Sequence, residues 1–172
     1  KIDDRIIQPT LKGLKKDNID FVGFVFIGLI RVGDDPFVIE YNVRMGDPET
    51  QVVLPRIEND MVELLAATAE KRLDKVSIQI SPKAAATVVG VSGGYPEAYE
   101  KGKEITGIST DALIFHAGTM LKDGKLVTNG GRVLASTGFE TDVHDALTSA
   151  YANLTNVAFE GMYFRKDLGF DL

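Results

Sequence analysis

The pattern of hydrophobic and polar positions changes near Leu73, and the two parts of the chain predict different elements. Before Leu73, a helical stripe of apolar residues predicts a helix that starts near Gln8, with Pro9 tolerated in its first turn. The apolar run over 21–30 predicts a strand that is buried on both faces. A turn over 33–36 leads into a second extended segment, so we expect a hairpin.

Two helix starts follow this hairpin, whose second strand we expect over 37–42. Asp47 is predicted to cap a helix that has Pro48 in its first position. Asp60 and Glu63 have the spacing of a capping box, which predicts the start of a longer helix.

Beyond Leu73, short apolar segments alternate with Gly-rich turns. Asp123 and Gly124 form a dipeptide that strongly favours a hairpin turn, and an amphipathic stripe predicts a final helix over about 141–154. These elements predict an α+β fold, with one module in residues 1–73 and a second in residues 74–172. The strands expected in the second module cover 76–80, 84–91, 113–121, 126–128 and 132–136.

Composition narrows the classes of partner. The chain has 19 Lys and Arg against 25 Asp and Glu, a net charge of −6, which disfavours nucleic acid and anionic membrane surfaces as partners. The absence of Cys excludes disulfides, thiolate zinc sites and Cys nucleophiles. No apolar run approaches the about 20 residues of a membrane-spanning helix. Because the chain begins at Lys1 without an initiator Met, we expect it to be a piece of a longer protein.

The densest group of chemically useful side chains lies in the second strand of the predicted hairpin and just after it. Side chains alternate along a strand, so Glu40, Asn42 and Arg44 are expected on one face. A carboxylate and an amide oxygen about 7 Å apart suit a hard cation such as magnesium, and the Arg can hold a phosphate or carboxylate. By spacing alone, the solvated polar face of an edge strand explains the same pattern equally well.

Four further features have a chemical and a structural interpretation. Backbone N–H groups near Gly46 and Asp47 could bind an anion, although we favour the interpretation that Asp47 caps the helix. The segment 130–132, Gly-Gly-Arg, could form a phosphate-binding nest, but we favour the interpretation as a turn between two strands. His116 is expected to be buried, hydrogen-bonded and structural, and His144 to face solvent.

A family resemblance emerges from residues 40–51, Glu-Tyr-Asn-Val-Arg-Met-Gly-Asp-Pro-Glu-Thr-Gln. This string resembles the signature of the glycinamide ribonucleotide synthetase (phosphoribosylamine–glycine ligase) family, ATP-grasp enzymes of purine biosynthesis. Other segments resemble the landmarks of that family in the same order and spacing, so the resemblance extends over essentially the whole chain. They cover 9–14, 28–30, 93–96, 115–119, 128–133 and 164–169.

The resemblance implies a fold, an activity and a set of partners. It implies that residues 1–73 are the end of an ATP-grasp domain, with antiparallel strands plus helices, and that residues 74–172 are a small C-terminal α+β domain. The family joins glycine to 5-phosphoribosylamine through glycyl phosphate, giving glycinamide ribonucleotide, ADP and phosphate. It uses ATP as co-substrate with Mg²⁺ or Mn²⁺, and the resemblance implies a cytoplasmic protein.

Position by position, the resemblance assigns Glu40 and Asn42 as the metal ligands. Arg44 becomes a candidate for stabilising the transferred phosphoryl group. Together with Gly46, Asp47 and Pro48, it is also a candidate for substrate binding. Gly28 stands where many ATP-grasp proteins place another metal-binding Glu, which implies fewer protein ligands and more water around the cation.

The alternative is that the chain, as it stands, is a non-catalytic binding or structural module. The resemblance places the ATP lid and the adenine contacts upstream of Lys1, so we expect no ligase turnover from these 172 residues alone. The segment over 21–30 would also lack neighbouring strands of a larger sheet. Unpaired strand edges and apolar surface favour non-native self-association.

Overall fold

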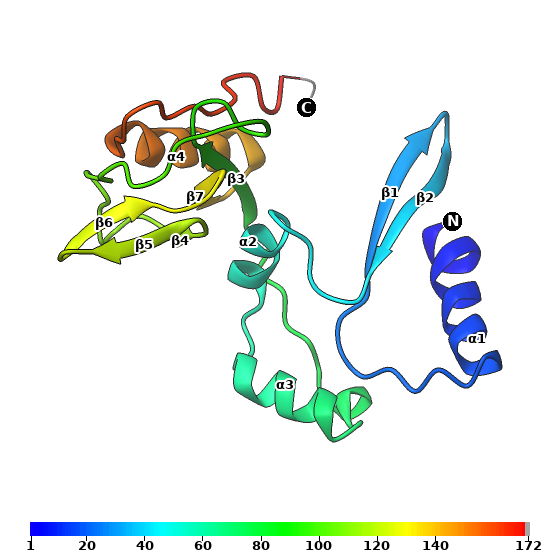
Figure 1. Cartoon of the computed structure of the whole chain (residues 1–172). Helices are drawn as coiled ribbons and strands as arrows, with labels where there is room; N and C mark the ends of the chain where they lie inside the picture. Colours follow the sequence, from blue (N-terminus) through cyan, green and yellow to red (C-terminus); the bar gives the residue numbers. More distant parts are fainter. Residues whose placement is uncertain (171–172) are drawn as a thin grey trace. The chain divides into compact units, whose positions relative to one another are not determined.

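The computed structural model describes residues 1–170, which form two compact units. Unit 1 consists of Lys1–Asp47 and Asn59–Gln79, and unit 2 of Pro48–Glu58 and the chain from Ile80 onward. Both units combine helices with antiparallel strands, so the predicted α+β fold class is confirmed (Figure 1). The sequence-based boundary near Leu73 stays a prediction. No helix among the described residues is long and apolar enough to span a membrane.

Unit 1 begins with a helix that runs beside a two-stranded hairpin. A π-helical turn, η1 (Asp3–Ile7), passes directly into α1 (Gln8–Lys16), which confirms the predicted helix start. The Gln8 N–H donates to the Asp3 carbonyl in the wide π pattern, immediately before Pro9, which has no N–H to donate.

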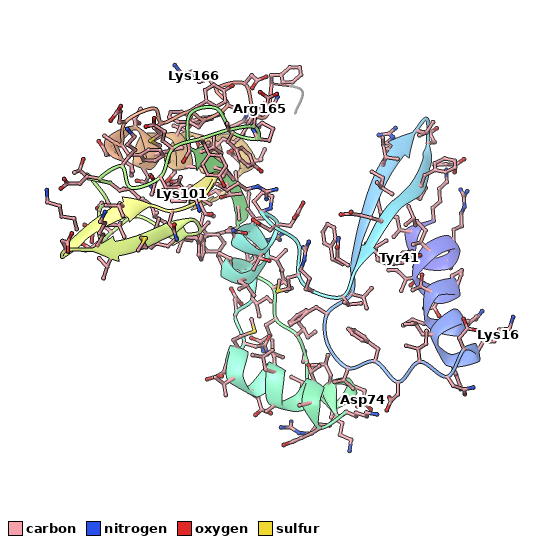
Figure 2. The ribbon with its side chains drawn as sticks, viewed as in Figure 1. Lys16, Tyr41, Asp74, Lys101, Arg165 and Lys166 are labelled. Carbon is pink, nitrogen blue, oxygen red and sulfur yellow. The ribbon has the colours of Figure 1, made fainter. Side chains whose placement is uncertain are left out.

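The hairpin pairs β1 (Phe26–Val32) with β2 (Asp35–Asn42), as the turn residues predict (Figure 1). Tyr41 reaches from β2 to α1, where its hydroxyl lies 2.9 Å from the Thr10 hydroxyl (Figure 2). Among the described residues, this sheet has two strands, so neither strand has a second neighbour there.

The predicted strand over 21–30 is wrong in its start and in its burial. β1 begins only at Phe26, and residues such as Phe21 precede it without strand pairing. Ile30 is 51% exposed, and Val22 and Phe24 are 45% and 42% exposed. A continuous apolar run signals burial only when other layers cover both faces of the strand. Among the described residues of unit 1, the hairpin is not covered on both faces, so several of its apolar residues are exposed.

The remaining helix of unit 1 begins where the capping signal places it. Asp60 occupies the N-cap of α3 (Met61–Ala69), and its carboxylate accepts the Glu63 N–H at 3.1 Å. After the short η3 (Leu73–Lys75), the predicted strand over 76–80 does not form, apart from one bridge between Ile80 and Ile57 within unit 2.

Unit 2 opens with a short helix that starts later than expected. Helix α2 is Thr50–Val53 with Glu49 at its N-cap, so Asp47 and Pro48 belong to the preceding turn instead of the helix start. It continues into η2 (Leu54–Arg56), because Pro55 cannot donate the hydrogen bond that would extend a regular helix.

The core of unit 2 is an antiparallel sheet covered by one helix. The strand order is β3–β7–β4, with β3 (Ala84–Val91), β7 (Arg132–Glu140) and β4 (Ile114–His116). Helix α4 (Val143–Asn156) packs across β3 and β7, and its N-cap Asp142 accepts the Asp145 N–H at 2.9 Å (Figure 1). Fully buried Val88, Val133, Leu134, Ala150 and Leu154 form the centre of the core.

The predicted strand over 113–121 is interrupted. It divides at Ala117 and Gly118 into β4 and β5 (Thr119–Lys122), which belong to different sheets. The Asp-Gly signal is correct, since Asp123 and Gly124 form the turn between β5 and β6 (Lys125–Thr128). The strand predicted over 132–136 extends farther, to Glu140.

Candidate functional site

Glu40 and Asn42 lie together on one face of β2, as the strand period predicts. The Asn42 side-chain N–H donates to Glu40 Oε1 over 2.9 Å, which orients the two side chains toward one another. Glu40 is exposed and Asn42 is half-buried, so solutes can reach the pair. The hydrogen bond uses Glu40 Oε1 and the Asn42 amide nitrogen. Glu40 Oε2 and Asn42 Oδ1 are then the oxygens suited to a hard cation, so the donor chemistry fits Mg²⁺ or Mn²⁺.

Gly28 gives Glu40 its space. In the antiparallel register Gly28 is the direct partner of Glu40, and an added Cβ at Gly28 would lie 3.0 Å from Glu40 Cγ. Even the first atom of a side chain would therefore push against the Glu40 side chain. A second carboxylate at this position would compete with Glu40 for the same face of the hairpin.

Arg44 lies two residues beyond the end of the strand that carries Glu40 and Asn42. Strand β2 ends at Asn42, and the chain bends at the next two residues, so strand periodicity no longer sets the direction of Arg44. Its Nη1 donates to the carbonyl of Met45 at 2.8 Å, and the side chain is exposed. The predicted placement on one face is therefore correct for Glu40 and Asn42, and it stays a prediction for Arg44.

The predicted substrate loop spans the junction of the two units. Gly46 is buried and Asp47 exposed, and both take part in interactions with other residues. Pro48, the first residue of unit 2, is half-buried. It lines a cavity in unit 2 that the sequence did not reveal.

This cavity has a volume of about 370 Å³ and lies between the end of the central sheet and the C-terminal segment of unit 2. Its walls are mainly apolar and aromatic, with two arginines and no acidic side chain among the described residues that line it. They are Pro48, Thr87, Val88, Val89, Val91, Tyr95, Arg132, Tyr163, Phe164, Arg165 and Leu168. No local pattern in the sequence indicates this cavity, because strand pairing and loop packing bring its lining residues together from distant parts of the chain.

Arg132 lines the cavity from the start of β7, where it contacts Tyr95. Its Nε donates to the Tyr95 hydroxyl at 3.1 Å. The Tyr95 ring packs on the backbone of Gly131, where an added Cβ would come within 2.1 Å of the ring. Neither Gly130 nor Gly131 has a positive φ, so the expected alternative of a turn is correct and the alternating nest conformation is not formed.

Arg165, the second arginine of the lining, forms an ion pair. Its Nε and Nη2 donate to the two carboxylate oxygens of Asp167, each at 2.9 Å. This hydrogen-bonded ion pair lowers the pKa of the Asp167 carboxyl and raises the pKa of Arg165. The charge of Arg165 is therefore largely compensated by its neighbour.

The two histidines lie outside the described lining of this cavity. His116 Nδ1 lies 3.1 Å from Thr119 Oγ1, as expected for a hydrogen-bonded structural residue, but the ring is exposed and the predicted burial is wrong. His144 is exposed on α4, as expected. The described residues contain no cluster of three or more His, Cys, Asp or Glu side chains that could hold a metal ion. A cation at Glu40 and Asn42 would therefore take its other ligands from water, substrate or other protein segments.

Comparison with protein families yields two successive matches, separated by residues 51–84. Residues 1–50 match the model described as phosphoribosylglycinamide synthetase, ATP-grasp (A) domain. Residues 85–171 match the model described as phosphoribosylglycinamide synthetase, C domain. The order of the two matches agrees with the order of domains that the sequence resemblance implies.

Curated relatives and a solved structure give the same result. The phosphoribosylamine–glycine ligase of Agrobacterium fabrum is 48% identical over 95% of this chain and 40% of its own length. A bifunctional purine biosynthetic protein of Pichia angusta is 46% identical over 98% of this chain and 22% of its own. The crystal structure of phosphoribosylamine–glycine ligase from Thermotoga maritima matches with a TM-score of 0.82 and 40% identity, covering 92% of this chain and 40% of that one. The chain thus spans about two fifths or less of these proteins.

Proposed function

Because the chain belongs to the phosphoribosylglycinamide synthetase family, we propose that it is part of an ATP-dependent ligase that joins glycine to 5-phosphoribosylamine. Its fold is the end of an ATP-grasp domain followed by the C-terminal domain. The observation that carries the proposal within the chain is the hydrogen-bonded pair of Glu40 and Asn42 on the accessible face of β2. This pair supplies the oxygen donors that the chemistry requires of a metal–nucleotide site.

The proposed ligase reaction has two steps, phosphorylation of glycine and then amide formation. A carboxylate oxygen of glycine attacks the γ-phosphorus of ATP, the bond to the leaving ADP oxygen breaks, and glycyl phosphate forms. The amine of phosphoribosylamine then attacks the glycyl carbonyl carbon and gives up a proton to solvent, while phosphate leaves with the former carboxylate oxygen. Glu40 and Asn42 would hold Mg²⁺ or Mn²⁺, which neutralises charge on the phosphate oxygens of ATP during phosphoryl transfer.

The neighbouring residues have proposed roles in substrate binding. Arg44 carries an exposed guanidinium two residues after Asn42, where it can meet the transferred phosphoryl group or an anionic substrate. Gly46, Asp47 and Pro48 would shape the adjacent part of the substrate site. The Met45 carbonyl that Arg44 contacts would be exchanged for the substrate when it binds.

The isolated chain is proposed to lack ligase activity. It spans only 40% of the Agrobacterium enzyme, and its metal-ligand pair has no third carboxylate or imidazole ligand nearby among the described residues. The complete enzyme would use ATP, glycine and 5-phosphoribosylamine, and we propose that it acts in the cytoplasm. By itself, the chain would be a binding or structural module.

Oxygen-18 transfer tests the proposed reaction. The complete protein is supplied with ATP, phosphoribosylamine and glycine labelled with ¹⁸O in its carboxylate, and the released phosphate is examined by mass spectrometry. The mechanism predicts one ¹⁸O atom per phosphate, with ADP formation dependent on glycine. Unlabelled phosphate would refute activation of the glycine carboxylate by phosphorylation. Turnover by these 172 residues alone would refute the proposed inactivity of the isolated chain.

A further inference from the structure

Helix α2 carries a backbone acceptor that its own helix cannot use. A helical carbonyl accepts the N–H of the residue four positions later, and for Gln51 that residue is Pro55, which has no N–H. The N–H three positions later, on Leu54, donates to the Thr50 carbonyl instead. The Gln51 carbonyl therefore depends on a donor from outside the helix, because an unpaired carbonyl inside the protein is costly.

Thr137 on β7 supplies this donor. Its hydroxyl donates to the Gln51 carbonyl over 3.2 Å, and Thr137 is only 2% exposed, so solvent does not offer an alternative donor there. At the next residue, Gly138, an added Cβ would meet the α4 backbone at Ala146. Since side chains alternate along a strand, Thr137 faces away from α4, toward α2, which packs against β3 and β7 (Figure 1).

A second hydroxyl holds the Thr137 side chain in place. Thr87 of β3 is the direct partner of Thr137 in the antiparallel register, and the two Oγ1 atoms lie 3.0 Å apart. The Thr87 hydroxyl donates to the Ser136 carbonyl at 3.1 Å, so its oxygen stays available as an acceptor. The Thr137 hydroxyl is thus held between Thr87 Oγ1 and the Gln51 carbonyl, which fixes its direction toward α2.

Gln51 connects this contact to Pro48. Its N–H donates to the Pro48 carbonyl over 3.3 Å, and the Val53 N–H closes the same turn by donating to the Glu49 carbonyl at 3.0 Å. A short chain of bonds therefore runs from buried Thr137 through Gln51 to Pro48, which lines the cavity of unit 2. A displacement of Gln51 would be passed on to Pro48.

We propose that Thr137 is a positioning residue for the ligase: its hydroxyl holds Gln51 and thereby keeps Pro48 in place for substrate binding. This inference rests on the proposed function, in which Pro48 helps to shape the substrate site. Thr137 acts through the backbone of Gln51 and needs no contact with the substrate.

Hydrogen exchange in the complete protein, measured by mass spectrometry on peptides that cover 48–54, tests the contact itself. Thr137→Val keeps the shape of the side chain but removes the hydroxyl, and is expected to speed exchange in this segment about fivefold or more. Thr137→Ser keeps the hydroxyl and should retain slow exchange. Thr128→Val is the matched control, since Thr128 is 1% exposed and its hydroxyl oxygen accepts the Lys103 N–H at 3.1 Å, outside α2. Equal exchange in the two Val variants would overturn the positioning contact.

Steady-state kinetics of glycine-dependent ADP formation then test the role of Thr137 in the reaction. A displaced Pro48 weakens substrate binding, so Thr137→Val is expected to raise the KM of glycine or phosphoribosylamine about threefold to tenfold. A mere loss of folded protein would lower kcat and leave both KM values unchanged. Thr137→Ser should restore the KM, and Thr128→Val should not alter it.

Unchanged KM values in Thr137→Val, or a raised KM that Thr137→Ser does not restore, would overturn the positioning role. The ¹⁸O experiment on the unsubstituted protein reports the ligase function separately. If that function failed, the exchange measurement would still decide whether Thr137 holds Gln51 and Pro48 in place.

Discussion

Replacing Leu134 by Ala tests whether the sheet of unit 2 is the stabilising core that positions the cavity. Leu134 is fully buried in β7, two residues after Arg132, and belongs to the central hydrophobic cluster. The substitution removes three buried carbons, a transfer cost of about 2.4 kcal/mol at about 0.8 kcal/mol each. The space left behind adds to this cost, which gives a total of about 3–5 kcal/mol.

The assay is unfolding in urea, monitored by the near-ultraviolet circular dichroism of the tyrosines. The protein has 5 Tyr and no Trp, and all but Tyr41 lie in unit 2, so near-ultraviolet circular dichroism mainly reports that unit. With an m-value of about 2 kcal/mol/M, a loss of 3 kcal/mol lowers the midpoint by about 1.5 M. Leu121→Ala is the matched control, because Leu121 is 73% exposed in the β5–β6 hairpin and its loss should cost under about 1 kcal/mol. Equal midpoints for the two variants would refute the packing argument.

Three further predictions follow from individual contacts. Asp60→Ala removes the N-cap of α3 and should destabilise unit 1 by about 1 kcal/mol in thermal unfolding, whereas Asp60→Asn should preserve most of the stability. The Asp167 carboxyl, whose pKa is lowered by Arg165, should titrate in NMR below its ordinary value near 3.8, and Arg165→Met should remove that difference. Its contribution to stability is thus present above pH 3.8 and is lost as the pH falls through the lowered pKa; an unshifted titration would contradict the ion pair. The 172-residue chain should self-associate in sedimentation, and charged substitutions at Ile39 and Val43, which are 64% and 73% exposed, should reduce this association; a monomer at all concentrations would contradict the inference from the exposed hairpin.

Local signals in the sequence predicted local structure well. The Asp123-Gly124 turn, the Asp60 cap and the alternation that places Glu40 beside Asn42 all depend on residues within a few positions of one another. These features follow from backbone conformational preferences and side-chain geometry, which act over short distances.

Errors arose where the surroundings decide the outcome. The apolar run over 21–30 does not reveal whether other layers cover it, so its burial could not be obtained from composition alone. The position predicted for Arg44, on the same face as Glu40 and Asn42, depends on a strand that ends two residues earlier. The cavity joins Pro48 with Arg132 and Arg165, which are distant in sequence, and no local rule predicts such a meeting.

We propose Glu40 and Asn42 as ligands of the catalytic cation, and a single kinetic measurement tests this proposal. It is the Mg²⁺ concentration dependence of glycine-dependent ADP formation by the complete protein. Glu40→Gln preserves side-chain size but removes the charge, and should raise the half-maximal Mg²⁺ concentration about tenfold or more. Glu58→Gln, at an exposed position outside the proposed site, should leave it unchanged. Identical Mg²⁺ dependence of Glu40→Gln and the unsubstituted protein would contradict the assignment.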